Sequence, residues 1–409
     1  MNKKLLVIGL RWPEPDSTAA GVRMLQLLEF FIREGYKITF ASSAAETQYS
    51  FPLEILGIQK QAIQLNHTSF DIFISDLQPN IVLFDRFLTE EQFGWRVAEQ
   101  VPNALRILDA EDLHSLRHVR EQYLKKQVPF TAQLWKQDDK TKREIASIYR
   151  CDISLIISSF EMELLLQELR IDKNLLLHLP FMEEELPKKP DWNPFEARND
   201  FIFIGGGKHT PNIDAIKQLK TEIWPLIHQQ LPEAKLHIYG SYLPQQILEF
   251  NRPEESFYVH GRVENVGEVM CNAKICLAPL RFGAGIKGKL LQAMKFGTPS
   301  ITTPIGAEGM HGDLPWNGSI ATNPAAFARA AVKIYSSKNK WEMAQAKGIT
   351  LINAIYSKSK LQKTLNNTLK RLQQDVQKHR DANFIGSLLQ HQTLQSTKFM
   401  SKWIEAKNK

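Results

Sequence analysis

Apolar and polar positions alternate along the chain in a way that predicts strands and helices in turn. Residues 5–10 form an apolar run that predicts a first strand, and apolar positions three or four residues apart within 21–32 predict an amphipathic helix. Gly35 ends that helix, and residues 37–42 predict a second strand. A strand, a helix and a second strand in this order are typical of a βαβ unit, so we expect a parallel sheet.

Further apolar runs extend this sheet through the first half of the chain. Three of them, each followed by polar residues, predict strands at residues 81–84, 104–108 and 153–157. Prolines and charged residues then interrupt the pattern at residues 180–194, a composition typical of a linker. We therefore expect a doubly wound, Rossmann-like α/β domain over residues 1–180 and a linker over residues 181–199.

The same alternation restarts after the linker. Residues 200–205 predict a strand, and residues 212–229 predict a helix that bends or ends near Trp224 because Pro225 follows it. More strands are predicted at residues 234–240, 275–279 and 300–303. We therefore expect a second Rossmann-like domain over residues 200–360 that faces the first across a cleft.

The last part of the chain, residues 361–409, is polar with a helical pattern. Apolar groups within residues 384–389 and 399–404 are its expected contact points, so we expect this extension to pack back on the two domains. Near its end, Lys402, Trp403, Lys407 and Lys409 form a weakly basic group interrupted by Glu405. We favour a solvated helix face for this group over a weak contact with an anionic membrane surface.

Composition adds limits on class and compartment. The 409 residues are 43% hydrophobic and 23% charged, which suits a globular protein with two cores, and the net charge of +7 favours anionic partners. Charge alone does not choose among a nucleotide, a membrane surface and nucleic acid. The three cysteines, Cys151, Cys271 and Cys276, lack the short spacing of zinc or redox sites, which predicts packing roles in a reduced compartment. We expect a cytoplasmic protein, with a peripheral position at the inner membrane face as the alternative.

A glycine-rich basic loop is the strongest chemical signal. Residues 281–289 combine glycines with Arg281, Lys287 and Lys289, directly before apolar positions that predict a helix. Unpaired N–H groups and the positive dipole end at a helix start favour an anion such as a diphosphate. The loop therefore predicts a substrate that carries phosphate.

Three segments, residues 203–215, 281–289 and 297–309, occur in an order that resembles the donor-binding domain of GT-B glycosyltransferases. Within that fold they are similar to the retaining enzymes of glycosyltransferase family 4; the resemblance is specific in the C-terminal half and looser in the N-terminal half. It implies a nucleotide-sugar donor held by the C-terminal domain and an acceptor held by the N-terminal domain. It also implies sugar transfer with retention, without a divalent metal or other cofactor, and the sequence contains no Asp-x-Asp motif.

The resemblance also assigns donor-binding residues. It places Arg281 and Lys287 against the diphosphate, with the backbone of Gly285 and Ile286 beside them and Lys208 as a second basic candidate. Such cations stabilise the negative charge that develops on a departing nucleoside diphosphate. The alternative is a set of solvated surface cations, which we would favour for an isolated pair, but the glycine spacing and the family order reverse that preference.

The chain departs from the family at two acidic positions. The family commonly carries two glutamates separated by seven residues, and these fall here on Ala284 and Gln292. Glutamine can still hydrogen-bond hydroxyl groups, but it lacks the strength of a carboxylate. Glu308 either supplies a carboxylate elsewhere in the donor site or is a structural loop residue.

Polar residues after the predicted strand at 104–108 are the candidates for catalysis. Asp109, Glu111, Asp112 and His114 lie where ligands bind in open α/β sheets, so they could position an acceptor hydroxyl or the donor sugar. In the other interpretation, Asp109 or Asp112 caps the helix that begins near Leu113.

Gly21 and His209 complete the candidate donor site. Gly21 allows a close approach of the backbone to the donor. His209 follows the glycine turn at residues 205–207, although a lone histidine is more often structural. That turn lacks the spacing of a dinucleotide fingerprint, which argues against a dehydrogenase.

The sequence therefore predicts a glycosyltransferase that moves a sugar from a nucleotide diphosphate to a glycan, a lipid-linked or a small-molecule acceptor, with no nucleic-acid partner. Two alternatives stay open. A nucleotide-sugar 2-epimerase on the same fold would need a fuller set of acid/base carboxylates in the cleft. A non-catalytic binding subunit would keep the fold without the chemistry, which Ala284 and Gln292 would permit.

Overall fold

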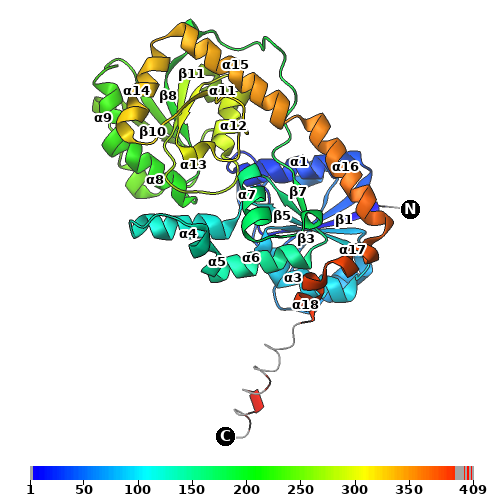
Figure 1. The fold of residues 1–409 in the computed structure, drawn as a ribbon. Helices are drawn as coiled ribbons and strands as arrows, with labels where there is room; N and C mark the ends of the chain where they lie inside the picture. Colours follow the sequence, from blue (N-terminus) through cyan, green and yellow to red (C-terminus); the bar gives the residue numbers. More distant parts are fainter. Residues whose placement is uncertain (1–2, 392–399, 401–402, 405–406, 408–409) are drawn as a thin grey trace.

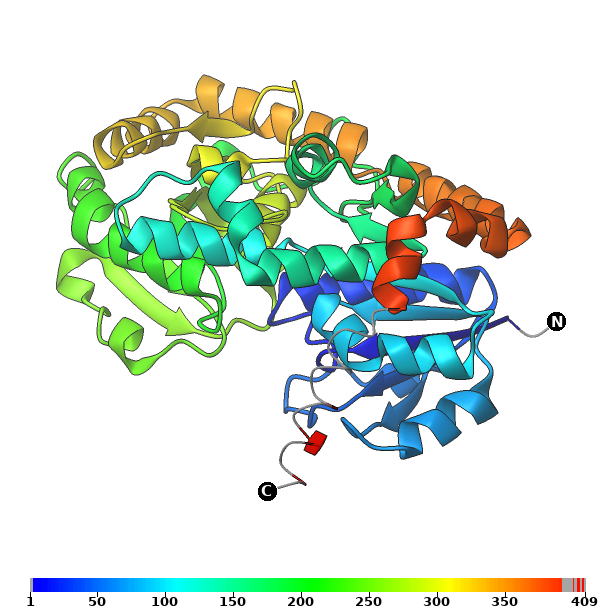
Figure 2. The same ribbon diagram turned by 60° about the horizontal axis from the view of Figure 1, so that its bottom comes forward.

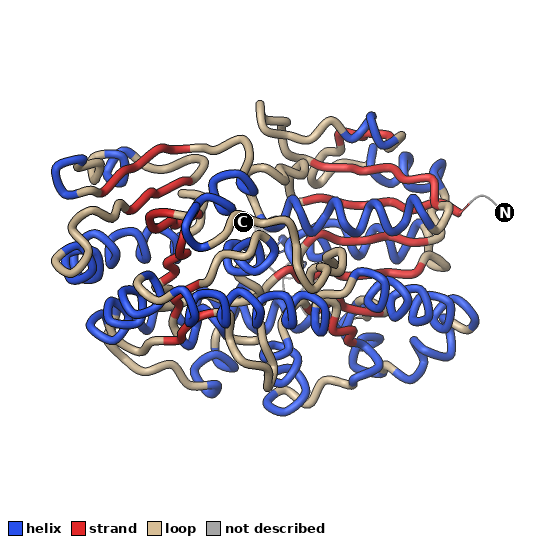
Figure 3. The backbone as a smooth tube through the Cα atoms, turned by 90° about the horizontal axis from the view of Figure 1, so that it is seen from above, coloured by secondary structure: helices blue, strands red, loops and turns tan. Residues whose placement is uncertain are grey.

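The protein consists of two parallel β-sheets, each packed between helices (Figure 1). A computed structural model describes residues 3–391, 400, 403–404 and 407. The first sheet has seven strands in the order β3-β2-β1-β4-β5-β6-β7, and the second has six in the order β10-β9-β8-β11-β12-β13. Figure 3 shows the two sheets side by side, with loops from both domains between them.

The N-terminal sheet is buried on both faces, as its near-continuous apolar strands predict. Its strands are β1 (Lys3–Gly9), β2 (Tyr36–Ser42), β3 (Gln59–Ala62), β4 (Ile81–Asp85), β5 (Leu105–Glu111), β6 (Ile153–Ile156) and β7 (Leu176–His178). Its helices are α1 (Ala19–Arg33), α2 (Ser69–Leu77), α3 (Phe87–Gln100), α4 (His114–Lys125), α5 (Ala132–Gln137), α6 (Asp139–Arg150) and α7 (Ser159–Glu163). Leu6 and Ile8 of β1 belong to a core with α2 to α6, whereas Leu5 and Val7 belong to a core with α1.

The C-terminal sheet has the same layered construction. Its strands are β8 (Asn199–Ile204), β9 (Leu236–Tyr239), β10 (Phe257–Gly261), β11 (Ala273–Ala278), β12 (Ser300–Thr302) and β13 (Gly318–Ile320). Its helices are α8 (Thr210–Gln218), α9 (Trp224–His228), α10 (Gln245–Leu248), α11 (Val266–Asn272), α12 (Gly288–Lys295), α13 (Pro304–Ala307), α14 (Pro324–Tyr335) and α15 (Lys338–Ile355). Phe201 and Phe203 face a core with α8, α9 and α14, while Ile202 packs towards α11 and α12.

The helix predicted around Pro225 is divided. Its first part, α8, is followed by a π-helical turn over Leu219–Ile223, and α9 begins at Trp224. Proline lacks the N–H of a regular helical turn, which explains the break at this point. The regular α-helix is thus interrupted directly before Trp224, close to the predicted position.

The chain returns to the N-terminal domain after α15 (Figure 2). The helices α16 (Lys358–Gln374), α17 (Val376–Ala382) and α18 (Phe384–Gln390) follow, and Leu365, Leu369 and Leu372 of α16 are buried in the core beside α1. The apolar contact expected within residues 384–389 is largely wrong, because Phe384, Ile385 and Leu388 are exposed.

The α18 helix instead contacts α6 through polar groups, in which Asn383 donates to the backbone oxygen of Tyr149. Of the second predicted contact group, Met400, Trp403 and Ile404 are described and exposed. Lys402 and Lys409 of the basic group lie outside the described residues. In the described part of the chain, no helix has the length and apolar content needed to cross a bilayer.

Candidate functional site

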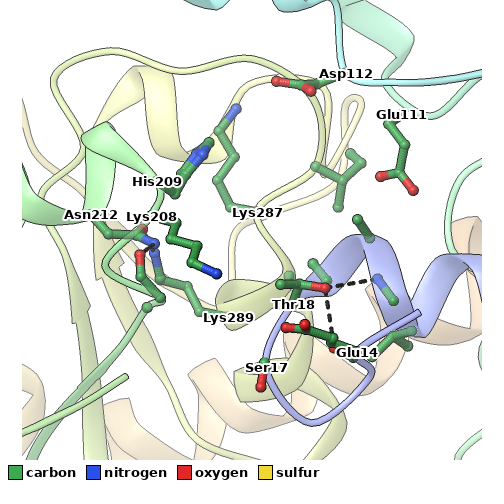
Figure 4. Close-up of a pocket in the computed structure, with 18 of the residues that line it drawn as sticks. Glu14, Ser17, Thr18, Glu111, Asp112, Lys208, His209, Asn212, Lys287 and Lys289 are labelled. Atoms are coloured by element: carbon green, nitrogen blue, oxygen red, sulfur yellow. Dashed lines mark hydrogen bonds between the residues drawn. The ribbon is translucent and has the colours of Figure 1, made fainter. Parts of the chain in front are cut away.

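A cavity of about 480 Å³ lies between the two domains (Figure 4). Loops that follow β1, β4 and β5 form its N-terminal wall, and loops that follow β8 and β11 form its C-terminal wall. Both sheets therefore present the carboxyl ends of their strands to one space, which is where open α/β sheets bind ligands.

Three lysines line the C-terminal wall. The Lys208 Nζ lies 3.4 Å from the centre of the Tyr242 ring, while the Nζ of Lys287 donates to the backbone oxygen of Gly285 at 2.7 Å. The Lys289 Nζ donates to Oδ1 of Asn212. Burial lowers the pKa of Lys287 and of Lys289 to about 8, because charged ammonium groups lose hydration in the cleft. A bound anion would restore favourable interactions to these groups.

The glycine-rich loop leads directly into α12. Lys287 is the N-cap residue of this helix, and no side chain of the described residues caps it. Ile286, Gly288 and Gln292 line the same cavity, so the start of the helix and its dipole face the open space. This arrangement suits an anion such as a diphosphate.

Gly285 docks this loop against the other domain. Its φ is +63°, and its N–H donates to Oε1 of Glu161 at 2.8 Å. A Cβ at this position would lie 2.6 Å from the Cβ of Asp112. Gly285 therefore does not line the cavity but allows the two domains to approach closely.

Two charged residues assigned to the donor site are directed elsewhere. Arg281 forms an ion pair with Asp214 of α8, remains partly exposed and lies outside the cavity wall. Glu308 binds Arg120 of α4 and also lies outside the wall. The structure thus brings Lys208, Lys287 and the start of α12 together, but it does not bring Arg281 or Glu308 to them.

On the N-terminal wall, Glu111 faces the cavity (Figure 4). The pairing of β5 with β6 is irregular between Asp109 and Glu111, and the φ of Glu111 is +61°. This strained turn directs the side chain out of the sheet. Burial, with the nearby charge of Asp109, raises the pKa of Glu111 to about 8, which favours the protonated form of the carboxyl group.

Asp112 and His114 lie beside Glu111 in the same wall. The Asp112 carboxylate is 3.2 Å from the Nε2 of His114 and is ion-paired with Arg117. Burial alone would raise the pKa of Asp112, but Arg117 and His114 together lower it. Asp112 is therefore a stable anion that orients the side chains of His114 and Arg117 at the cavity.

Asp109 is a structural residue instead. It is fully buried and accepts from Arg23 of α1, with 3.1 Å between Nη2 and Oδ1. The capping interpretation is also wrong, since α4 has Leu113 as its N-cap residue. Glu144 of α6 accepts from the N–H groups of His114 and Ser115 at 2.9 and 3.0 Å.

The two remaining predicted residues, His209 and Gly21, also line the cavity. Burial, with the charge of Arg117, lowers the pKa of His209 to about 3, so its ring is neutral. Gly21 has no room for a side chain, because a Cβ would lie 2.4 Å from the backbone carbon of Glu14. The hydroxyl of Thr18 accepts from the N–H of Gly21 and donates to the backbone oxygen of Glu14, which holds this loop in place.

Several cavity residues were not predicted. Arg11, Glu14 and Ser17 belong to the loop after β1, and Tyr242 follows β9. Glu14 accepts from the hydroxyl groups of Tyr242 and Thr47, at 3.1 and 2.6 Å. The sequence offered one signal for the residues of the first loop. The polar loop at residues 11–20 follows an apolar strand directly, and such loops bind ligands in open α/β sheets.

Comparison with known proteins identifies the second domain. Residues 198–337 match the family described as glycosyl transferases group 1. This domain is similar to the group 1 glycosyltransferases. The matched region contains the three lysines and α12, so the cavity wall described above belongs to the domain that carries the family signature.

Solved structures show that this chain has the GT-B fold over about nine-tenths of its length. Sucrose-phosphate synthase from Thermosynechococcus elongatus is 14% identical, with a TM-score of 0.65 over 91% of this chain and 99% of that protein. Anabaena HepE, solved with UDP and glucose, is 10% identical, with a TM-score of 0.65 over 91% of this chain and 100% of that protein. A Staphylococcus aureus TarM variant, solved with UDP, is 14% identical, with a TM-score of 0.55 over 73% of this chain and 57% of that protein.

A group 1 domain on a GT-B fold indicates that the protein is a glycosyltransferase. No curated protein matches the chain in sequence. The matches favour neither the 2-epimerase nor the non-catalytic subunit as an alternative.

Proposed function

We propose that the protein transfers a sugar from a nucleoside diphosphate sugar and holds the diphosphate with Lys208, Lys287, Lys289 and the start of α12. The observation that carries this proposal is the convergence of three lysines and an uncapped helix on one cavity. Such fixed positive groups stabilise a leaving diphosphate most strongly where water is largely excluded. The presence of UDP in the HepE and TarM structures supports a nucleoside diphosphate as the ligand class.

The opposite wall is proposed to bind the reacting hydroxyl groups. The protonated carboxyl of Glu111 can donate a hydrogen bond, while the Asp112 carboxylate holds His114 in position at the cavity. In the transfer, a bond forms between the acceptor oxygen and the anomeric carbon while the bond from that carbon to the diphosphate breaks. The acceptor proton is released to the departing diphosphate oxygen, which the lysines stabilise.

Retention and metal independence are part of the proposal. Retention is carried over from the similarity to family 4, and Ala284 places a methyl group where the family commonly has a carboxylate. The lysines supply the positive charge that a divalent ion would otherwise provide. We expect turnover to persist in EDTA and the product to keep the anomeric configuration of the donor by NMR.

A thermal-shift screen of nucleotides and nucleotide sugars tests the donor site. A ligand that binds only the native protein raises its melting temperature, and UDP is the first probe. Lys287→Ala combined with Lys289→Ala should abolish the shift, whereas the exposed Lys338→Ala is the matched control. The donor assignment is wrong if no nucleotide stabilises the protein, or if the double variant responds as the wild type does.

A further inference from the structure

A second cavity, of about 210 Å³, lies at the opposite edge of the N-terminal sheet. Arg106, near the start of β5, and Asp152, directly before β6, line it from the sheet side. Arg380 of α17 and Ser387 of α18 line it from the C-terminal helices. The donor cleft, by contrast, meets β5 at its carboxyl end, so the two cavities are separate.

Two of the three arginines around this cavity are fully paired. Arg380 donates to both carboxylate oxygens of Asp152 at 2.7 Å and to the backbone oxygen of Ala104 at 2.7 Å. Arg150 donates to Glu90 through its Nε at 2.9 Å. Asp152 and Glu90 are therefore already occupied by these two side chains.

Arg106 is the exception. Its side chain is only 9% exposed, and no hydrogen bond joins its guanidinium group to any of the described residues. The distance from its Nε to Oδ2 of Asp152 is 3.9 Å, too long for a hydrogen bond. Burial and the charge of Arg380 lower the pKa of Arg106. The Nε of Arg106 is buried and has no hydrogen-bond partner among the described residues, and such an unmet donor is costly, which indicates that an acceptor belongs in the cavity.

We propose that this cavity binds a small oxyanion of the phosphate type. An oxyanion supplies acceptors and a negative charge to Arg106, the arginine of this wall whose guanidinium no described carboxylate hydrogen-bonds. The volume is much larger than the roughly 15 Å³ that one water needs. Asp381, the other carboxylate in the wall, is exposed, where water screens its charge.

The position of the site gives the anion a structural consequence. Asp152 already joins β6 to α17 through Arg380, and Gln390 of α18 donates to the backbone oxygen of Arg150 at 3.2 Å. An anion on Arg106 would touch both the sheet and these helices. Its binding therefore stabilises the docking of α17 and α18 on the N-terminal domain.

Inorganic phosphate is the probe, and the variant Lys287→Ala with Lys289→Ala is the background, because it removes two of the three lysines of the donor cleft. In that background, calorimetry should show one phosphate site and a melting temperature that rises more in phosphate than in chloride of equal ionic strength. Arg106→Gln should weaken phosphate binding about tenfold or more, since charge-assisted hydrogen bonds are lost. A negative result here does not affect the donor assignment, because Arg106 lies in the second cavity and not in the donor cleft.

A second variant keeps the test decisive if Arg106→Gln does not fold. Asp381→Asn keeps the shape of the rim and removes a negative charge, so it should tighten phosphate binding by about twofold to fivefold. The proposal is overturned if chloride reproduces the stabilisation, or if the folded variants bind phosphate as tightly as the background does. In either case, the cavity holds water only.

Discussion

Arg120 of α4 and Glu308 of the C-terminal domain form a paired ion contact between the two domains. The distances are 2.7 Å from Nη1 to Oε1 and 2.9 Å from Nη2 to Oε2. The same Nη1 donates to the backbone oxygen of Gly283 at 2.8 Å. One arginine therefore connects the N-terminal domain to the glycine-rich loop and to the loop that follows α13.

Glu308→Gln should weaken this interdomain contact. Removing one partner of a largely buried charge pair leaves the other charge unpaired, at a cost of about 2–5 kcal/mol. We expect a larger radius of gyration by small-angle X-ray scattering and weaker UDP binding by calorimetry. Glu196→Gln, which breaks the exposed pair with Lys338, is the control and should change neither. An unchanged radius in Glu308→Gln would show that the pair does not hold the domains together.

Gly285→Ala should impair donor binding more than it impairs folding. Its Cβ would lie 2.6 Å from the Cβ of Asp112, so the loop must shift away from the other domain. Gly35→Ala is a matched control, because Gly35 also has a positive φ, of +79°, but nothing lies near its added Cβ. Both variants should lose about 1–2 kcal/mol of stability from backbone strain. Only Gly285→Ala should also bind UDP at least about tenfold more weakly, which calorimetry measures; equal UDP affinity in the two variants would contradict the close approach.

Donor binding should weaken as the pH rises above 8. Burial lowers the pKa of Lys287 and Lys289 to about 8 in the empty cleft, and a bound diphosphate raises both. Binding therefore takes up protons near pH 8; the affinity is level below that pH and falls above it, by up to about tenfold per pH unit for each lysine. Calorimetry of UDP binding in buffers of different ionisation enthalpy measures this uptake. Proton release, or an affinity that stays level to pH 9.5, would contradict the assignment.

Glu111→Ala should slow turnover without weakening nucleotide binding. Glu111 lies on the wall opposite the lysines, and burial with the charge of Asp109 raises its pKa to about 8. Losing its hydrogen bond to a reacting hydroxyl should lower kcat by about tenfold to a hundredfold, while the Kd for UDP changes by less than about twofold. Steady-state kinetics and calorimetry on the same preparation separate the two effects. If the affinity for UDP fell in proportion to kcat, Glu111 would instead be assigned to nucleotide binding.

Arg23→Met should destabilise the N-terminal domain. Arg23 and Asp109 are both fully buried, and the arginine also donates to the backbone oxygen of Pro180 at 2.8 Å. Leaving Asp109 as an unpaired buried charge costs about 3–5 kcal/mol, which chemical denaturation measures. The double variant with Asp109→Leu removes both charges and should recover much of that loss. A single variant as stable as the wild type would show that Asp109 is neutral in the folded protein.

The hydrophobic pattern alone predicts the central strands of both sheets, and the spacing of glycines and lysines predicts the basic loop. Central strands are buried on both faces, so β1, β4, β5, β8 and β11 appear as mainly apolar runs. The four strands that were not predicted, β3, β7, β10 and β13, are the edge strands of the two sheets. Edge strands are partly exposed, so their residues carry a weaker pattern.

Which charged residues face the cleft depends on contacts between distant parts of the chain. Lys287 lies there because it begins α12, a local feature that its own segment predicts. Arg281 and Asp109 point away because each has a partner far along the chain, 67 and 86 residues distant. A charged side chain turns towards an oppositely charged group that it can reach. Such groups come from distant segments of the chain, so only the packing of the fold brings them close. The sequence could therefore predict the diphosphate loop, but only the folded chain separates the residues that line the cleft from those that hold it together.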